Sequence, residues 1–106
     1  MRVNCLIASF LLFCGPASAQ QTAGDAAAGH TFALKSCSDC HVVDARLQDL
    51  ASDAVPSFTA IAANKDSTPS QLRTFLQKPH GQMPDLQLSR VQIDNVIAYI
   101  VSLRRR

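Results

Sequence analysis

The clearest hydrophobic pattern in the chain lies near its C-terminus. Ser89 and Gln92 have the spacing of a capping box, in which each side chain accepts a hydrogen bond from the backbone N–H of the other residue at a helix start. Behind them, the apolar residues recur at helical spacing and form one broad stripe: Ile93, Val96, Ile97, Ile100 and Leu103. This pattern predicts a C-terminal helix that buries one face.

Two shorter helices are predicted upstream. The first follows Asp25 and spans 26–36, and its apolar positions fall on one face: Gly29, Phe32, Ala33 and Cys37. The second is opened by Pro56 and Ser57 and runs to about Asn64. Its inward positions at helical spacing are Phe58, Ile61 and Ala62.

A third upstream helix has a distinct start signal at Thr68. Pro69 suits the first helical position, and Gln71 has the spacing to complete a capping box with Thr68. The helix must stop near Lys78, because Pro79 disfavours helical geometry in the residue before it. We expect it to turn three side chains inward: Leu72, Phe75 and Leu76.

The remaining stretches read as loops. Residues 42–55 mix polar and small side chains without a firm period, which leaves room for a short helix, and residues 79–88 read as an ordered loop punctuated by Pro and Gly. Neither a repeat nor any long strand-like alternation is visible. The chain is therefore predicted to be all-α, with about four short helices.

The N-terminal residues 1–19 have the features of a secretory signal peptide. A basic start precedes an apolar run from Cys5 to Phe13, and Ala17, Ser18 and Ala19 form a small-x-small cleavage signal. Cleavage after Ala19 leaves a domain of residues 20–106. The apolar run is about half the length that a bilayer span needs, so we expect no integral membrane segment after cleavage. The alternative is a lipid-modified Cys14, although the bulky residue before it suits such a site poorly.

Composition and charge narrow the function classes. The chain has 106 residues, 47% of them hydrophobic and 17% charged, which excludes a multidomain enzyme. The formal net charge of +2 argues against a nucleic-acid binder, and three of the bases are the terminal Arg104, Arg105 and Arg106, which we interpret as a solvated helix end. A domain this small has few apolar residues to bury, so its stability requires a disulfide, a metal or a bound group in addition. After cleavage, only Cys37 and Cys40 remain as cysteines.

The motif on which the function depends is formed by Cys37, Cys40 and His41. On a helical turn, positions i, i+3 and i+4 project to the same side. Two sulfurs can then reach the two vinyl groups along one porphyrin edge while the imidazole reaches the iron. This spacing is the attachment pattern of haem c.

Three other readings of the motif are weaker. A thioredoxin-type pair normally follows a strand, whereas a helix is predicted before Cys37. A zinc site needs a fourth ligand, and only His30 or His80 remains, at no recognised spacing. A structural disulfide between Cys37 and Cys40 gives no reason for His41.

A sixth ligand for the iron is expected far along the chain. After the initiator, Met83 is the only methionine, and it lies in a polar loop before Pro84. Such a loop is an unusual place for a methionine that only fills a gap in the core. His80 is the alternative ligand and would give a bis-histidine haem of lower potential. His30 is expected to be a solvent-facing helix residue.

On these residues, the sequence resembles the class I c-type cytochromes, which are small soluble electron carriers with a single haem. The resemblance covers the chain from Gly29 to Leu103. The motifs that carry it are Cys37-Ser38-Asp39-Cys40-His41, Met83-Pro84, Pro56, and the pairing of Gly29 and Phe32 on the first helix with Tyr99 on the last.

The resemblance implies a cytochrome c-like fold in which about four helices pack around one covalently bound haem c. Cys37 and Cys40 would form the thioethers, and His41 and Met83 would be the axial iron ligands. A ligating histidine needs an acceptor for its other nitrogen, and the carbonyl of Pro56 is the candidate. The alternative is that Pro56 only starts a helix. Gly29 would allow a close helix crossing.

These expectations lead to a periplasmic electron carrier that is not an enzyme and has no catalytic residue. With both axial positions filled by His41 and Met83, the iron has no open site and can only cycle between its ferrous and ferric states. The expected partners are redox proteins, a donor and an acceptor, met briefly by a monomer. The alternative is a ligand-binding or catalytic haem c protein in which Met83 is absent from the iron or leaves it easily.

Overall fold

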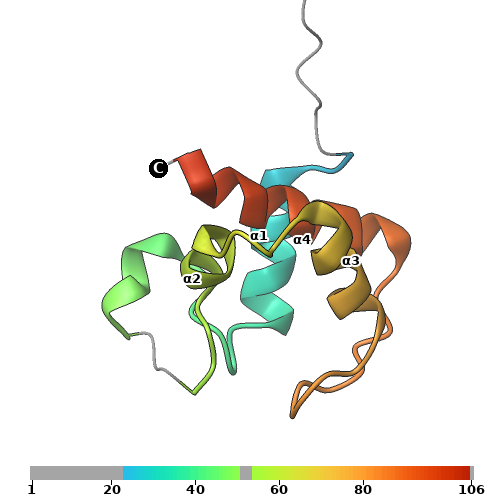
Figure 1. The fold of residues 1–106 in the computed structure, drawn as a ribbon, viewed down its shortest axis with the longest axis horizontal. Helices are drawn as coiled ribbons and strands as arrows, with labels where there is room; N and C mark the ends of the chain where they lie inside the picture. Colours follow the sequence, from blue (N-terminus) through green and yellow to red (C-terminus); the bar gives the residue numbers. More distant parts are fainter. Residues whose placement is uncertain (1–22, 51–53, 106) are drawn as a thin grey trace, which may run out of the picture.

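The computed structural model describes residues 23–50 and 54–105, and within them the regular structure is entirely helical (Figure 1). In chain order, the elements are α1 (Ala26–Ser36), the 3-10 helix η1 (Ala45–Leu50), α2 (Phe58–Ala63), α3 (Pro69–Gln77), α4 (Arg90–Ser102) and the 3-10 helix η2 (Leu103–Arg105). The predicted all-α class and its four α-helices are confirmed. The predicted signal peptide and the alternative at Cys14 lie outside the described residues.

The helix starts follow the capping signals with one exception. Asp25 accepts hydrogen bonds from the first backbone N–H groups of α1, and the capping box between Ser89 and Gln92 is complete at the start of α4. At α3, the Thr68 hydroxyl accepts from the Gln71 N–H at 3.2 Å. The Thr68 N–H, however, donates to the carbonyl of Asp66 at 2.8 Å, so the prediction of a capping box there is wrong.

The crossing of α1 and α4 organises the fold, and Figure 1 shows α4 running across α1. At Gly29 the backbones approach so closely that a Cβ atom would lie 1.9 Å from the carbonyl oxygen of Asn95. The side chain of Asn95 also accepts a hydrogen bond from the Asp25 N–H at 2.8 Å. The predicted role of Gly29 in a close crossing is confirmed, because any side chain there would push the helices apart.

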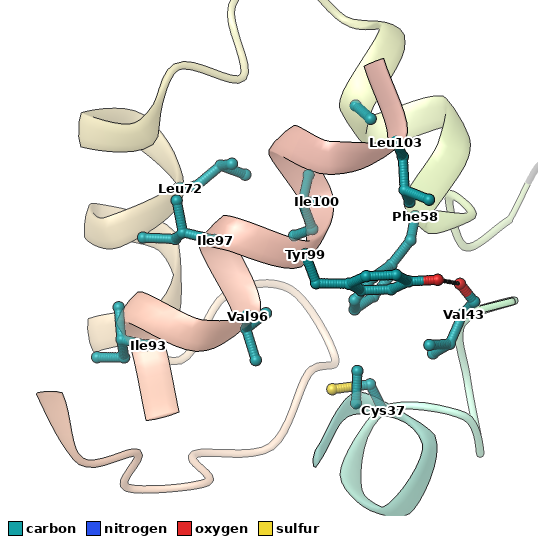
Figure 2. Packing of buried hydrophobic residues seen from close by; sticks show 12 residues of the cluster. Cys37, Val43, Phe58, Leu72, Ile93, Val96, Ile97, Tyr99, Ile100 and Leu103 are labelled. Atoms are coloured by element: carbon teal, nitrogen blue, oxygen red, sulfur yellow. Dashed lines mark hydrogen bonds between the residues drawn. The ribbon is translucent and has the colours of Figure 1, made fainter. Parts of the chain in front are cut away.

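The core gathers around α4 (Figure 2). The whole predicted stripe is buried, together with α1, α2 and α3 residues: Ala33, Cys37, Phe58, Ala62, Leu72, Ile93, Val96, Ile97, Ile100 and Leu103. A salt bridge between Arg73 and Asp94 also ties α3 to α4. The prediction that Phe75 points inward is wrong, because its side chain is 54% exposed and lies edge-on to His80. The prediction is confirmed for Leu72, which is buried, and for Leu76, which packs against the core.

The 3-10 helix η2, which follows α4, is bonded to α2 and to the segment after it. The Arg104 guanidinium donates to the carbonyl of Ala62 at 3.0 Å and also to the carbonyl of Ser67. Arg104 is exposed, as predicted for a solvated helix end, but its guanidinium also binds backbone, and the Ala62 carbonyl is one that the end of α2 leaves without a helical partner. None of the helices in the described part of the chain is long and apolar enough to cross a membrane.

Candidate functional site

The turn that ends α1 carries the two cysteines and the histidine of the motif. The backbone N–H groups of Cys40 and His41 both donate to the carbonyl of Cys37, at 3.2 and 2.9 Å. The chain therefore continues to wind past the end of α1, which brings the three side chains to one turn. Both thiols are free. Cys37 packs in the core beneath α4, and burial raises the pKa of its thiol, whereas Cys40 is exposed.

The imidazole of His41 is held by the segment that leads into α2. Its Nδ1 lies 2.7 Å from the carbonyl oxygen of Pro56. A carbonyl only accepts, so Nδ1 carries the hydrogen and Nε2 keeps the lone pair that can bind a metal. The ring also lies edge-on to Phe58, with 5.5 Å between the ring centroids. The structure thus brings Pro56 to His41 and leaves Nε2 as the free ring nitrogen.

Two further hydrogen bonds fix the backbone that leaves His41. The Phe58 N–H donates to the carbonyl of Val42 at 3.0 Å, and the Tyr99 hydroxyl donates to the carbonyl of Val43 at 2.8 Å. Sequence reasoning placed Tyr99 only as a packing partner of α1 and missed this bond. No local signal reveals it, because donor and acceptor are far apart along the chain and the acceptor is a backbone atom.

Met83 lies in a tight turn of the loop between α3 and α4. Its N–H donates to the carbonyl of His80 at 3.0 Å, and Gly81 takes a left-handed φ of +54° at the first central position. Glycine meets that requirement of a type II′ turn without strain. In Figure 1 this loop lies on one side of the turn that ends α1, and the segment leading into α2 lies on the other.

The alternative ligand His80 is engaged locally. Its Nδ1 lies 3.1 Å from the carbonyl oxygen of Lys78, and its ring lies edge-on to Phe75 at 5.1 Å between centroids. Both His80 and Met83 are half-buried. The turn therefore presents two candidate donors from the same loop, a thioether and an imidazole.

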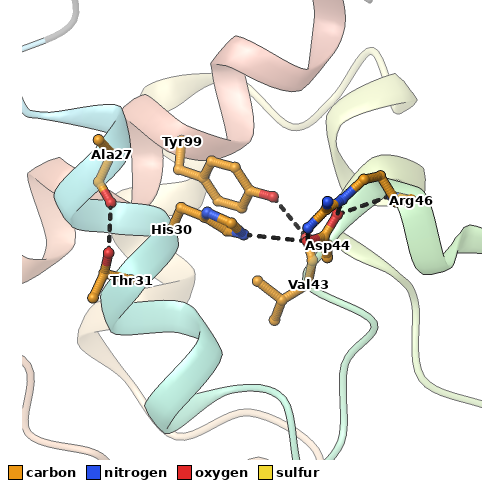
Figure 3. Close-up of polar contacts among 7 residues, drawn as sticks. All are labelled: Ala27, His30, Thr31, Val43, Asp44, Arg46 and Tyr99. Carbon is orange, nitrogen blue, oxygen red and sulfur yellow. Dashed lines mark hydrogen bonds and ion pairs between the residues drawn. The ribbon is translucent and has the colours of Figure 1, made fainter.

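The prediction that His30 faces solvent is wrong. Its ring stacks on Tyr99 with 4.7 Å between centroids, and its Nε2 lies 3.9 Å from Oδ2 of Asp44 (Figure 3). The reason is the close crossing at the neighbouring Gly29, which brings α4 over this part of α1. Periodicity within one helix cannot show which second helix covers it.

The donor set of the site suits a haem better than a bare metal ion. Two free thiols and an imidazole with a free Nε2 stand on one turn, as a porphyrin joined at one edge and ligated through its iron requires. Within residues 23–50 and 54–105, no three His, Cys, Asp or Glu side chains are grouped as ligands of a metal ion would be.

Comparison with known proteins points in the same direction. The profile of the family described as Cytochrome c matches residues 26–104. The chain is 39% identical over 104 residues to a protein named cytochrome c-552 from Bradyrhizobium diazoefficiens, in an alignment that covers 98% of this chain and 95% of that protein. No solved structure gives a significant match.

Proposed function

Because the chain belongs to the cytochrome c family of electron carriers, which bind haem c covalently and are not enzymes, we propose that it carries single electrons in the periplasm on one six-coordinate haem. Cys37 and Cys40 form the thioether bonds. His41, through Nε2, and Met83, through its thioether, would ligate the iron of the haem. The haem supplies the iron that cycles between two oxidation states, and the protein holds, shields and tunes it.

The observation that carries the proposal is the hydrogen bond between Nδ1 of His41 and the carbonyl of Pro56. This bond fixes the tautomer and the plane of the ring and increases the basicity of Nε2, as the outer partners of metal-bound histidines generally do. The Phe58 ring against the imidazole limits its rotation further. An imidazole held in this way would keep its orientation in both oxidation states of the haem.

Met83 supports the same proposal from the other side of the site. A thioether is a soft, neutral ligand that favours ferrous iron, and Met/His ligation raises the reduction potential of haem. The turn closed by the Met83 N–H and the His80 carbonyl restricts where that thioether can point. A haem held by both His41 and Met83 would supply electron transfer and would offer no site for a substrate.

The cellular setting follows from the predicted leader. Residues 1–19 would direct export, and cleavage after Ala19 would release residues 20–106 to the periplasm. The partners are a donor and an acceptor redox protein, met by a monomer. Cleavage removes Arg2 and lowers the formal net charge of the polypeptide from +2 to +1, so long-range steering of these encounters is modest.

The experiment that tests the function is a potentiometric titration of the purified red protein combined with exposure of the reduced form to carbon monoxide. We expect one reversible one-electron transition and almost no spectral response to carbon monoxide, because Met83 occupies the sixth position. Rapid formation of a carbon monoxide complex by the unaltered protein would instead support a ligand-binding or catalytic haem protein with a labile Met83.

A further inference from the structure

One polar atom in the described part of the chain has an unusual position. Nε2 of His30 is buried and has no hydrogen-bond partner among the described residues, although the side chain as a whole is 33% exposed. Native proteins rarely leave a buried polar atom in this state without a reason. Neither haem attachment nor helix packing uses this nitrogen.

The charged and titratable groups around His30 are few. The carboxylate of Asp44 lies 3.9 Å from Nε2, and the Tyr99 ring covers one face of the imidazole (Figure 3). Arg46 lies behind Asp44 and binds it through its side chain at 2.8 and 3.1 Å and through its backbone N–H at 3.0 Å. The neighbours of His30 one turn away along α1 are uncharged: Ala26, Ala27, Ala33 and Leu34.

Asp44 carries its negative charge throughout the neutral range. The side-chain hydrogen bonds from Arg46, and with a smaller effect the charge of His30, hold the pKa of the Asp44 carboxyl well below its usual range. A proton added to Nε2 of His30 therefore faces a permanent carboxylate. Imidazole is the side chain whose charge ordinarily changes between pH 5 and 8.

A series of ring contacts connects His30 to His41, the proposed iron ligand. The ring of His30 lies 4.7 Å from that of Tyr99, Tyr99 lies 6.1 Å from Phe58, and Phe58 lies 5.5 Å from His41, all between centroids. Asp44 also lies in the segment that follows His41. The residue before it, Val43, accepts a hydrogen bond through its carbonyl from the Tyr99 hydroxyl. The electrostatic interaction between His30 and the haem site therefore acts through packed side chains, where the effective dielectric constant is lower than in bulk water.

We propose that His30 is a proton-binding site coupled to the haem iron, so that this carrier takes up a proton with its electron in the neutral pH range. The inference rests on the proposed function. The electron comes from the donor protein and converts ferric to ferrous iron. The proton comes from solvent to Nε2 of His30, where it forms an ion pair with Asp44. Oxidation by the acceptor releases both.

The direction of the effect follows from charge. Reduction removes one positive charge from the iron, so protonated His30 is more favourable beside the ferrous than beside the ferric haem. By linkage, the reduction potential falls as the pH rises through the titration of His30 and is flat on either side. A tenfold difference in proton affinity between the two oxidation states corresponds to about 59 mV for a one-electron couple.

The test is the reduction potential of the holoprotein as a function of pH, for the unaltered chain and for His30→Gln. We expect the potential to fall across the neutral range in the unaltered protein and to be flat there in the variant. Thr31→Gln is the matched control, because its side chain is exposed on α1 and its hydroxyl bonds only within the helix, to the Ala27 carbonyl (Figure 3). This control should keep the pH profile of the unaltered protein.

Two further variants test the pairing itself. Asp44→Asn removes the carboxylate and should move the fall in potential to lower pH. Arg46→Gln removes the positive charge that competes with His30 for Asp44. Because the Arg46 side chain is 85% exposed, the change disturbs little packing, and the fall in potential should move to higher pH. The ring protons of His30, followed by NMR in the ferrous and ferric proteins, should titrate at a higher pH in the ferrous state.

Several results would overturn the proposal. They are a pH dependence that persists in His30→Gln, a potential that does not change with pH in the unaltered protein, and equal titration of His30 in both oxidation states. A reversible one-electron couple with any of these results would reject the proton site alone. The absence of a reversible couple would reject the proposed function.

Discussion

At the scale of single residues, the site depends on which atom of each side chain is left free. The carbonyl of Pro56 occupies Nδ1 of His41 and so presents Nε2, and the carbonyl of Lys78 lies near Nδ1 of His80 and leaves its Nε2 available as well. Met83 and His80 share one turn, so the backbone alone does not decide between them. The choice is made by ligand chemistry, and substitution of each side chain tests it.

Met83→Ala should open the sixth position of the iron. We expect ready binding of carbon monoxide or cyanide and a substantially lower potential, because axial ligation is a principal determinant within the roughly 0.8 V range of haem proteins. Met83→His should restore six-coordination without restoring the potential, since imidazole stabilises ferric iron better than a thioether does. Absorption spectra and potentiometry measure both effects.

His80→Ala is the control for this assignment, and it should leave the spectrum and potential nearly unchanged. The opposite pair of results, an open iron in His80→Ala and a closed one in Met83→Ala, would show that the ligand assignment is wrong. The protein would then be a bis-histidine carrier of lower potential.

At the scale of elements, the site is held in place by the crossing of α1 and α4. Gly29→Ala would place a Cβ atom 1.9 Å from the Asn95 carbonyl, which cannot move without shifting α4. Alanine is the better helix former by about 1 kcal/mol, but overpacking costs typically about 1–3 kcal/mol and here involves backbone. We therefore expect a net loss of stability, measured as a lower denaturant midpoint of the holoprotein.

A matched control for this variant is available on the same helix. Ala28→Ser adds one heavy atom at an exposed position next to Gly29 and should change the midpoint little. If Gly29→Ala were as stable as Ala28→Ser, the close crossing would not be what holds α1 against α4.

The elements also show how far sequence reasoning reaches. Helix starts with local signals, such as Asp25 and the capping box at Ser89, were predictable because donor and acceptor lie within one turn. The apolar stripe of α4 was predictable because its period is internal to the helix. The placement of Phe75, His30 and Arg104 was not, because each depends on a second element that the pattern of its own helix does not identify.

The same limit applies to the site. The ligand candidates Cys37, Cys40 and His41 could be proposed from spacing alone, since three positions on one turn meet by geometry. The Tyr99 hydroxyl on the Val43 carbonyl and the buried Nε2 of His30 could not, because both arise from tertiary contacts across the α1 and α4 crossing.

At the scale of the whole molecule, the apolar interior is small. In the described residues, the only large aromatic side chains in the buried core are Phe58 and Tyr99, and ordering each residue costs about 1–2 kcal/mol of conformational entropy. A chain with so thin a core needs the haem as part of its interior. Cys37→Ala combined with Cys40→Ala should therefore give a largely unfolded chain, with weak circular dichroism and no cooperative melting.

The control for this prediction lies between the two cysteines. Ser38→Ala with Asp39→Ala changes two exposed side chains of the same turn and keeps both thiols, so it should still give a red, folded protein. A cooperative thermal transition in the double cysteine variant, with no haem bound, would contradict the claim that folding requires the haem.

The intact mass of the denatured protein, purified after export, shows whether the exported chain carries one haem on Cys37 and Cys40. We expect the mass of residues 20–106 plus one haem, with nothing lost on denaturation because the bonds are covalent. A bare polypeptide mass, the slightly smaller mass of a Cys37–Cys40 disulfide, or a lipid-bearing chain that begins at Cys14 would contradict it.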